Sequence, residues 1–138
     1  MLKIFLPALL VLTAFNDALA RDRCHDLQDQ MFSYHDDGIE EYNAGVGYLL
    51  DVEEAIKKSD KSEYCRWLDK AIDEFNASWV SFDYAIETGQ EIAFECSSRL
   101  SDYAFSKLEK NIHKNRVNKR KALKKEDKFF ERYDSHCQ

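Results

Sequence analysis

The sequence predicts an all-α fold: a small helical bundle of three to four helices, arranged as two helical hairpins and held by two disulfides. Apolar residues recur at spacings of three and four, which places them along helix faces. Only one proline, Pro7, interrupts the 138 residues. The cysteines number four, an even count typical of disulfides in an exported chain. No stretch shows the strict apolar alternation of a half-buried strand.

The first twenty residues have the pattern of a secretory signal peptide. Lys3 gives a positive start, an apolar run follows over residues 4–12, and residues 18–20 offer the small side chains of a cleavage site. The run is shorter than the roughly 20 residues that span a bilayer, so we expect cleavage and no transmembrane anchor. Residues 21–138 would remain as one helical domain, exported to a periplasm or secreted.

Charge divides this domain into an acidic body, residues 21–106, and a basic C-terminal segment, residues 107–138. The body has eight Lys and Arg against twenty Asp and Glu, and the segment has eleven against five, or −12 and +6. We expect the segment to pack against the body because their charges are complementary. Export and the overall charge of −6 argue against a nucleic-acid partner.

The apolar stripes place the helices and their expected breaks. One stripe runs from Leu27 to Ile56, a second from Tyr64 to Ile86, and a third from Ile92 to Ile112, and apolar residues resume after residue 121. We expect breaks within residues 43–47, at Gly89, and near residue 116, where two asparagines interrupt the pattern. Gly38 and Gly45 lie on the first stripe and would let another helix approach closely.

The expected turns favour one pairing of the cysteines. Turns within residues 43–47 and near residue 116 bring Cys24 level with Cys65 and Cys96 level with Cys137, which makes these the favoured disulfides. Cys24–Cys96 with Cys65–Cys137 remains an alternative if the first helix bends near Gly38 and a new helix starts at Ser59-Asp60. A zinc site made by Cys24-His25 and His136-Cys137 is a third possibility, disfavoured by its ligand spacing.

We expect no catalytic residues, no cofactor and no metal site. The motifs typical of zinc proteases, serine hydrolases, phosphate-binding loops and haem attachment do not occur in residues 21–138. The acidic residues around His35 lie one turn apart on a helix, and we interpret them as a solvated face. Paired carboxylates are too common in a chain this acidic to indicate a glycosidase.

Surplus aromatic residues and divided charge favour a protein that works by binding another protein, of basic character. The candidate contacts are four aromatic and three basic residues: Tyr42, Tyr48, Trp67, Tyr84, Lys119, Arg120 and Lys121. A leader followed by a small cysteine-linked helical body resembles exported inhibitor and immunity proteins, which implies an inhibitor, immunity or adaptor role. The alternative is a carrier of a small ligand or metal ion in the bundle core.

Overall fold

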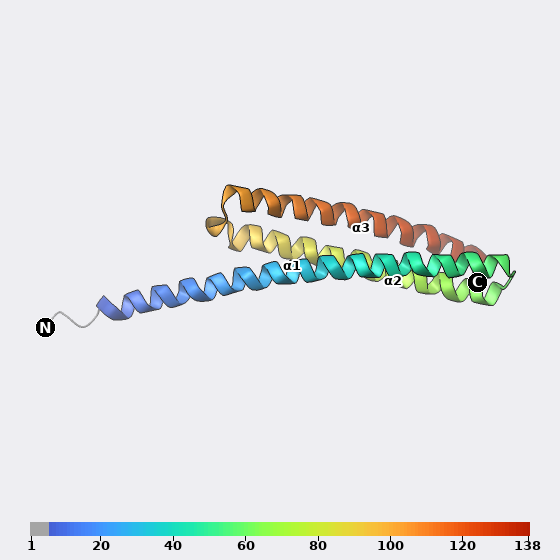
Figure 1. Ribbon diagram of the computed structural model, residues 1–138, viewed down its shortest axis with the longest axis horizontal. Helices are drawn as coiled ribbons and strands as arrows, with labels where there is room; N and C mark the ends of the chain where they lie inside the picture. The colour runs from blue at the N-terminus through green and yellow to red at the C-terminus, as the bar shows by residue number, and fades with distance from the viewer. Residues whose placement is uncertain (1–5) are drawn as a thin grey trace.

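Three α-helices make up most of the residues that the structure describes. The computed structural model describes the backbone of residues 6–138 and the side chains from Asp22 onward. Its elements are α1 (Leu6–Lys57), α2 (Lys61–Glu95), a short 3₁₀ turn η1 (Ser97–Arg99) and α3 (Asp102–Cys137). Figure 1 shows α1 and α3 lying along α2, with the first turns of α1 extending past the end of the bundle. The predicted all-α class is confirmed, and the two hairpins share α2 as their common arm.

The prediction of a break within residues 43–47 is wrong, because α1 continues through these residues. Gly45 lies against the ring of Phe75, where a Cβ atom would come within 2.9 Å of Cε1. Gly38 meets Phe82 in the same way, one heptad earlier on α1 and one heptad later on α2. The predicted close approach at these two glycines is therefore confirmed, and the close packing of α2 holds them in helical conformation.

The first turn lies at residues 58–60, and Asp60 makes hydrogen bonds to both of the helices that the turn joins. The Asp60 N–H donates to the Ala55 carbonyl and the Ser59 N–H to that of Ile56, each at 3.0 Å. This is the Schellman arrangement, with Ser59 in the left-handed conformation at φ 55°. The carboxylate of Asp60 then accepts from the Glu63 N–H at 2.9 Å and caps α2.

The second turn also differs in place from the prediction. α2 passes through Gly89, which is buried because Ile112 of α3 packs where its Cβ would be, at 2.7 Å. The chain reverses after Glu95, and Ser101 caps α3 by accepting from the Ala104 N–H at 3.2 Å. No turn forms near residue 116, because α3 is continuous and the buried Asn115 is satisfied by a hydrogen bond with His35.

The turn positions overturn the favoured disulfide pairing. Cys24 is bonded to Cys96 and Cys65 to Cys137, which is the alternative pairing. Because the first reversal lies at residues 58–60, Cys24 and Cys65 are separated by about 40 Å along the helix axes. The zinc reading is excluded as well, since all four cysteines are oxidised. The alternative pairing was expected to need a new helix at Ser59-Asp60 and a bend of the first helix near Gly38. The new helix does begin after Asp60, but α1 is continuous through Gly38.

Two hydrophobic clusters, each drawing on all three helices, hold the bundle. One lies toward the Cys24–Cys96 end and includes Met31, Ile86 and Ile112. The other lies toward the Cys65–Cys137 end and includes Phe75 and Phe129, whose rings stack at 5.9 Å. Phe75 and Phe82, which lie against Gly45 and Gly38 of α1, are fully buried.

The signal peptide expected over residues 1–20 lies where the structure describes no side chains, and residues 1–5 lie outside the described backbone. It stays a prediction. Within the described part of the chain, no helix is both long and apolar enough to cross a membrane. The two disulfides are compatible with an extracellular protein, since such bonds persist in oxidising surroundings.

Candidate functional site

Two aromatic pairs lie between α1 and α2 on one outer face of the bundle. Tyr34 of α1 meets Tyr84 of α2 with ring centroids 5.4 Å apart. Tyr48 stacks on Trp67 at 5.7 Å, with the ring planes 19° apart. Tyr34 and Tyr48 are two heptads apart on α1, so the pairs are separated by about 21 Å along the helix. Tyr84 is half exposed, and the other three rings are partly buried.

Two cations surround the Tyr48–Trp67 pair. The guanidinium carbon of Arg66 lies 4.5 Å from the Trp67 ring centroid. The ammonium of Lys70 lies 5.0 Å from Trp67 and 5.6 Å from Tyr48. Cations at these distances are attracted to the ring faces, so they help to fix the rings in place. Tryptophan, tyrosine and arginine are also the residues that most often dominate protein interfaces.

An acidic hollow lies between the two aromatic pairs. It has a volume of about 330 Å³ and is lined by Asp37, Glu40, Glu41, Ala44 and Glu74. Glu41 is one heptad from Tyr34 and one heptad from Tyr48, so it shares their stripe on α1. We call the two aromatic pairs and this hollow together the α1/α2 face.

Glu41 is partly buried in this hollow. Its partial burial raises its pKa, and the negative charges of Asp37, Glu74 and Glu40 act in the same direction. The Ser81 hydroxyl donates to Glu41 Oε2 at 2.7 Å and opposes the shift. The hollow therefore holds more negative charge than it can neutralise itself, and a cation placed there would relieve the repulsion.

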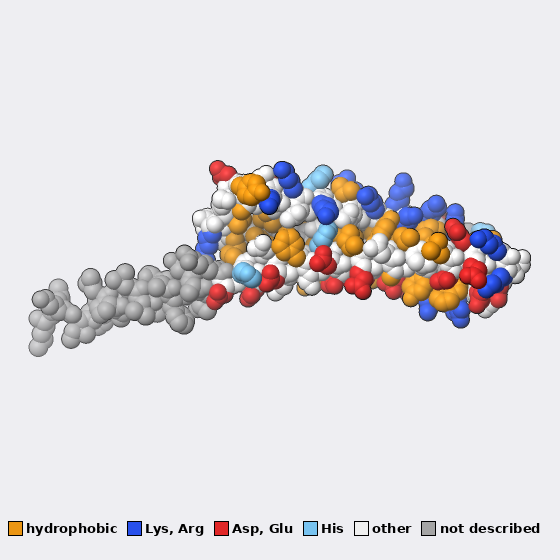
Figure 2. Space-filling model, in the orientation of Figure 1, with side chains coloured by type: hydrophobic (Ala, Val, Ile, Leu, Met, Phe, Trp, Pro, Cys, Tyr) orange, Lys and Arg blue, Asp and Glu red, His pale blue; other side chains and the backbone are white. Residues whose placement is uncertain are grey.

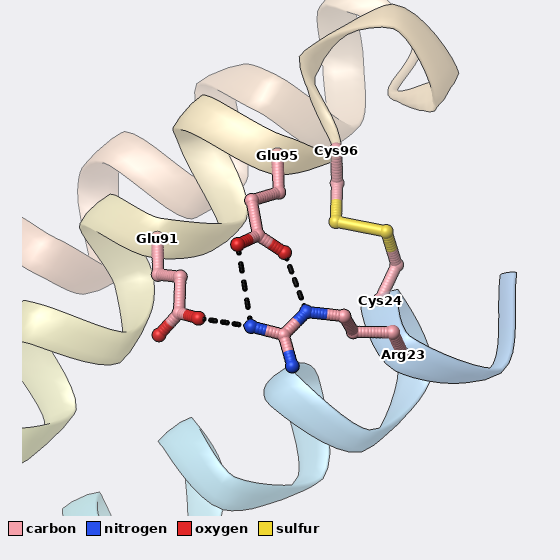
Figure 3. Close-up of a disulfide and its surroundings, with 5 residues drawn as sticks. All are labelled: Arg23, Cys24, Glu91, Glu95 and Cys96. Carbon is pink, nitrogen blue, oxygen red and sulfur yellow. Dashed lines mark hydrogen bonds and ion pairs between the residues drawn. A yellow bond between two sulfur atoms is a disulfide. The ribbon is translucent and has the colours of Figure 1, made fainter. Parts of the chain in front are cut away.

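An ion-pair cluster lies beside the Cys24–Cys96 disulfide, at one end of the α1/α2 face. Figure 3 shows Arg23 reaching from α1 toward two glutamates of α2, next to Cys24 and Cys96. Arg23 Nε and an Nη atom bind Glu95 at 2.6 and 3.2 Å, and the same Nη atom binds Glu91 at 2.6 Å. The hydrogen bond from Arg23 lowers the pKa of Glu95. Because the cluster is exposed, it orients the helix ends more than it stabilises them.

The three basic candidates do not form one patch. Lys119 binds Asp83 of α2 at 2.6 Å, which joins the basic segment to the acidic body as the charge division predicts. Arg120 is exposed. Lys121 lines a separate hollow between α1 and α3, together with Tyr42. Successive helix residues point about 100° apart, so a run of three cannot share a direction.

Of the four aromatic candidates, the structure brings Tyr48, Trp67 and Tyr84 to the α1/α2 face and leaves Tyr42 on another side, against Phe75. Sequence reasoning missed Tyr34, which is two heptads before Tyr48 and could have been found from that spacing. It also missed Arg66, Lys70 and Glu74 as neighbours, because their places depend on how α2 aligns with α1.

A larger hollow, of about 520 Å³, lies at the turn between α1 and α2. It contains Asp60, Ser135 and His136, residue types that can form a nucleophilic triad. Each is bonded to backbone instead: Asp60 caps α2, the Ser135 hydroxyl donates to the Glu131 carbonyl, and His136 Nδ1 donates to that of Arg132. This hydrogen bonding serves the helix ends.

Within the described residues, no group of three or more His, Cys, Asp or Glu side chains is arranged to hold a metal ion. The acidic residues around His35 divide between two sides of α1, with His35 bonded to Asn115 of α3 and Asp37 in the hollow beside α2. No family model, curated protein or solved structure matches the chain.

Proposed function

We propose that this is an exported, disulfide-linked binding protein of the inhibitor, immunity or adaptor type, and that it binds a basic protein partner on the α1/α2 face. The observation that carries the proposal is the acidic hollow set between two aromatic pairs. Aromatic rings supply contact area at low entropic cost, and carboxylates between them select a partner that carries Lys or Arg.

Preorganisation supports the proposal. The Cys24–Cys96 bond ties α1 to α2 at one end of the face, and Gly38 and Gly45 hold the two helices close along its length. Tyr48 and Trp67 are stacked and flanked by cations of the chain itself. A surface that is already ordered loses little conformational entropy on binding, so more of the contact energy becomes affinity.

Charge supports a basic partner. Asp37 and Glu40 are exposed at the hollow and have no ion pair among the described residues. Burial is the largest cause of the raised pKa of Glu41, and the negative charges of Asp37, Glu74 and Glu40 add to it. A partner that places a Lys or Arg in the hollow gains three or four carboxylate neighbours at once, and its approach is accelerated by the acidic field.

The test is capture of partners from the exported fraction, at low salt and at 0.5 M salt. We expect Trp67→Ala to reduce affinity for the captured partner at least tenfold, as loss of a central aromatic anchor does. Asp37→Lys should reduce it mainly at low salt, because the charge it reverses is exposed and screened. Tyr103→Ala and Glu109→Lys on α3 are the matched controls, and Tyr103 is 70% exposed.

Two results would contradict the proposal. A wild-type protein that captures nothing at either ionic strength has no such partner. Capture that survives both Trp67→Ala and Asp37→Lys uses another surface. The oxidised state and helicity of each variant are checked first by thiol titration and circular dichroism.

A further inference from the structure

A different side of the bundle, between α1 and α3, lacks the close packing seen elsewhere. Both helices lie along α2, but their backbones have no extended contact with each other. A hollow of about 230 Å³ remains between them, lined by Ile39 and Tyr42 of α1, Phe82 of α2, and Asn118 and Lys121 of α3. Below the surface, His35 Nδ1 donates to Asn115 Oδ1 at 2.6 Å and fixes how the two helices align.

An apolar stripe follows the α1 edge of this groove. Phe32, Ile39 and Val46 recur at heptad spacing and are 43%, 38% and 39% exposed. Ile39 lines the hollow, so its heptad neighbours lie on the same side of α1. The stripe is about 21 Å long. Single exposed apolar residues are normal on a protein surface, but three that recur along one edge of a groove indicate an interaction surface.

The two edges of the groove carry opposite charges. Figure 2 shows basic side chains gathered along α3, acidic ones along α1, and apolar ones between them. Lys114, Lys121 and Lys128 recur at heptad spacing on α3 and are exposed. On α1, the exposed Asp36 is four residues from Phe32 and three from Ile39, which places it beside the stripe.

We propose that a second copy of this chain covers the groove, in a parallel dimer whose two-fold axis runs along the helices. Such a rotation places α1 of each copy on α3 of the other, so each acidic edge meets a basic edge and the two apolar stripes meet between them. An interface that is negative on one edge and positive on the other is self-complementary under this operation. A two-fold axis across the helices would instead pair α3 with α3, basic against basic.

The alignment of the charges agrees with this geometry. The His35–Asn115 contact sets the levels of α1 and α3, which run in the same direction. A rotation about an axis along the helices leaves these levels unchanged. Asp36, one residue beyond His35, therefore comes within about 3 Å, measured along the axis, of Lys114 of the second copy.

The available surface is large enough for a dimer. From Cys24 to Lys57 the bundle is about 50 Å long, and two helices side by side are about 20 Å wide. The resulting face of about 1,000 Å² per copy exceeds the roughly 800 Å² that each partner contributes to a standard interface. The α1/α2 face lies elsewhere on the bundle, so the dimer and the proposed partner do not compete and the dimer does not depend on that partner.

The test is the mass of the oxidised protein by sedimentation velocity over a range of concentrations. We expect the wild-type chain to form a dimer. Asp36→Lys and Lys114→Glu should each raise the dissociation constant at least tenfold by setting like charges against each other. Ile39→Asp should do the same through the stripe, whereas Asp69→Lys, on an exposed site of α2, should change nothing.

Mixing gives the decisive result. An equimolar mixture of Asp36→Lys and Lys114→Glu should form a mixed dimer with wild-type affinity, because both of its charged contacts are complementary again. The double variant should dimerise by itself for the same reason. A wild-type chain that stays monomeric at about 100 µM, two decades above a micromolar dissociation constant, overturns the dimer. Failure of the mixture to dimerise, or assembly beyond a dimer, overturns the parallel two-fold arrangement.

Discussion

The ring of Phe82 lies directly against Gly38, where a Cβ atom would come within 2.8 Å of Cε1. The Gly38 carbonyl also accepts a hydrogen bond of 2.7 Å from the hydroxyl of the fully buried Ser78. Both contacts require the α1 backbone to approach α2 closely at this point. The absence of a side chain at Gly38 is therefore a condition for the alignment of the two helices, and with it for the α1/α2 face.

Gly38→Ala should destabilise the protein by about 1–3 kcal/mol, because the new methyl group displaces the buried ring of Phe82. The measurement is the free energy of unfolding from urea denaturation. Gly47→Ala is the control, since nothing lies within 4 Å of its Cβ position. In that exposed helical site, alanine should stabilise by about 0.5–1 kcal/mol. Equal effects of the same sign would contradict the close approach.

Ser59→Gly should stabilise the protein by up to about 1 kcal/mol. Ser59 has φ 55°, a left-handed conformation that glycine adopts without the cost that a Cβ imposes. Ser106→Gly, at an exposed site inside α3, should instead cost about 0.5 kcal/mol through helix propensity. Opposite shifts in thermal unfolding are expected, and a loss of stability in Ser59→Gly would count against the Schellman turn.

The pKa of Glu41 predicts a pH effect of definite sign. Because the pKa is raised in the folded state, that state holds the proton more tightly than the unfolded chain does. The contribution of this group is fully present below its unfolded pKa and is lost as pH rises through its folded pKa. Glu41→Gln keeps an oxygen acceptor for Ser81 and removes the titration.

The stability difference between Glu41→Gln and wild type should therefore increase in favour of the variant as pH rises above the ordinary glutamate value. Urea denaturation at a series of pH values from 4 to 7 measures it. Subtracting the wild-type curve removes the opposite contribution of Glu95, whose pKa is lowered by Arg23. A difference that does not vary with pH would show that the burial and charge around Glu41 have no energetic effect.

The disulfides predict a specific peptide map. Digestion without reduction should release the peptide of Cys24 joined to that of Cys96, and the peptide of Cys65 joined to that of Cys137. Each bond closes a separation of 72 residues, so replacing one pair by serine should cost up to about 4 kcal/mol in the chain-entropy model. Recovery of a Cys24–Cys65 peptide would refute the observed helix alignment.

The helical class could be predicted because apolar spacing reports the local geometry of a single helix. The turns could not be predicted, because a glycine can mark either a helix end or a close contact between two helices. Gly45 and Gly89 predict breaks between helices, yet a glycine inside a helix costs only about 1 kcal/mol, and the packing of Phe75 and Ile112 offsets this. At the true turn, the left-handed position is held by Ser59 and so gave no glycine signal.

The candidate site was predictable only in part, for a related reason. Tyr48, Trp67 and Tyr84 could be chosen as residues beside the cleanest stripe positions. Their grouping around Glu41 depends on which turn of α2 meets which turn of α1, and this alignment is set by the glycine contacts and the reversal at Asp60. The predicted pairing of the cysteines is wrong for the same reason, because the positions of the turns decide which cysteines lie level with each other.

The central position of α2 has a consequence for resistance to proteolysis. Exposed turns are where a backbone is most easily nicked, and the described part of the chain has two between its helices, one before and one after α2. A nick in the first leaves the fragments joined through Cys24 and Cys96, and a nick in the second leaves them joined through Cys65 and Cys137. Even after both cuts, three separate peptides would remain one covalent molecule.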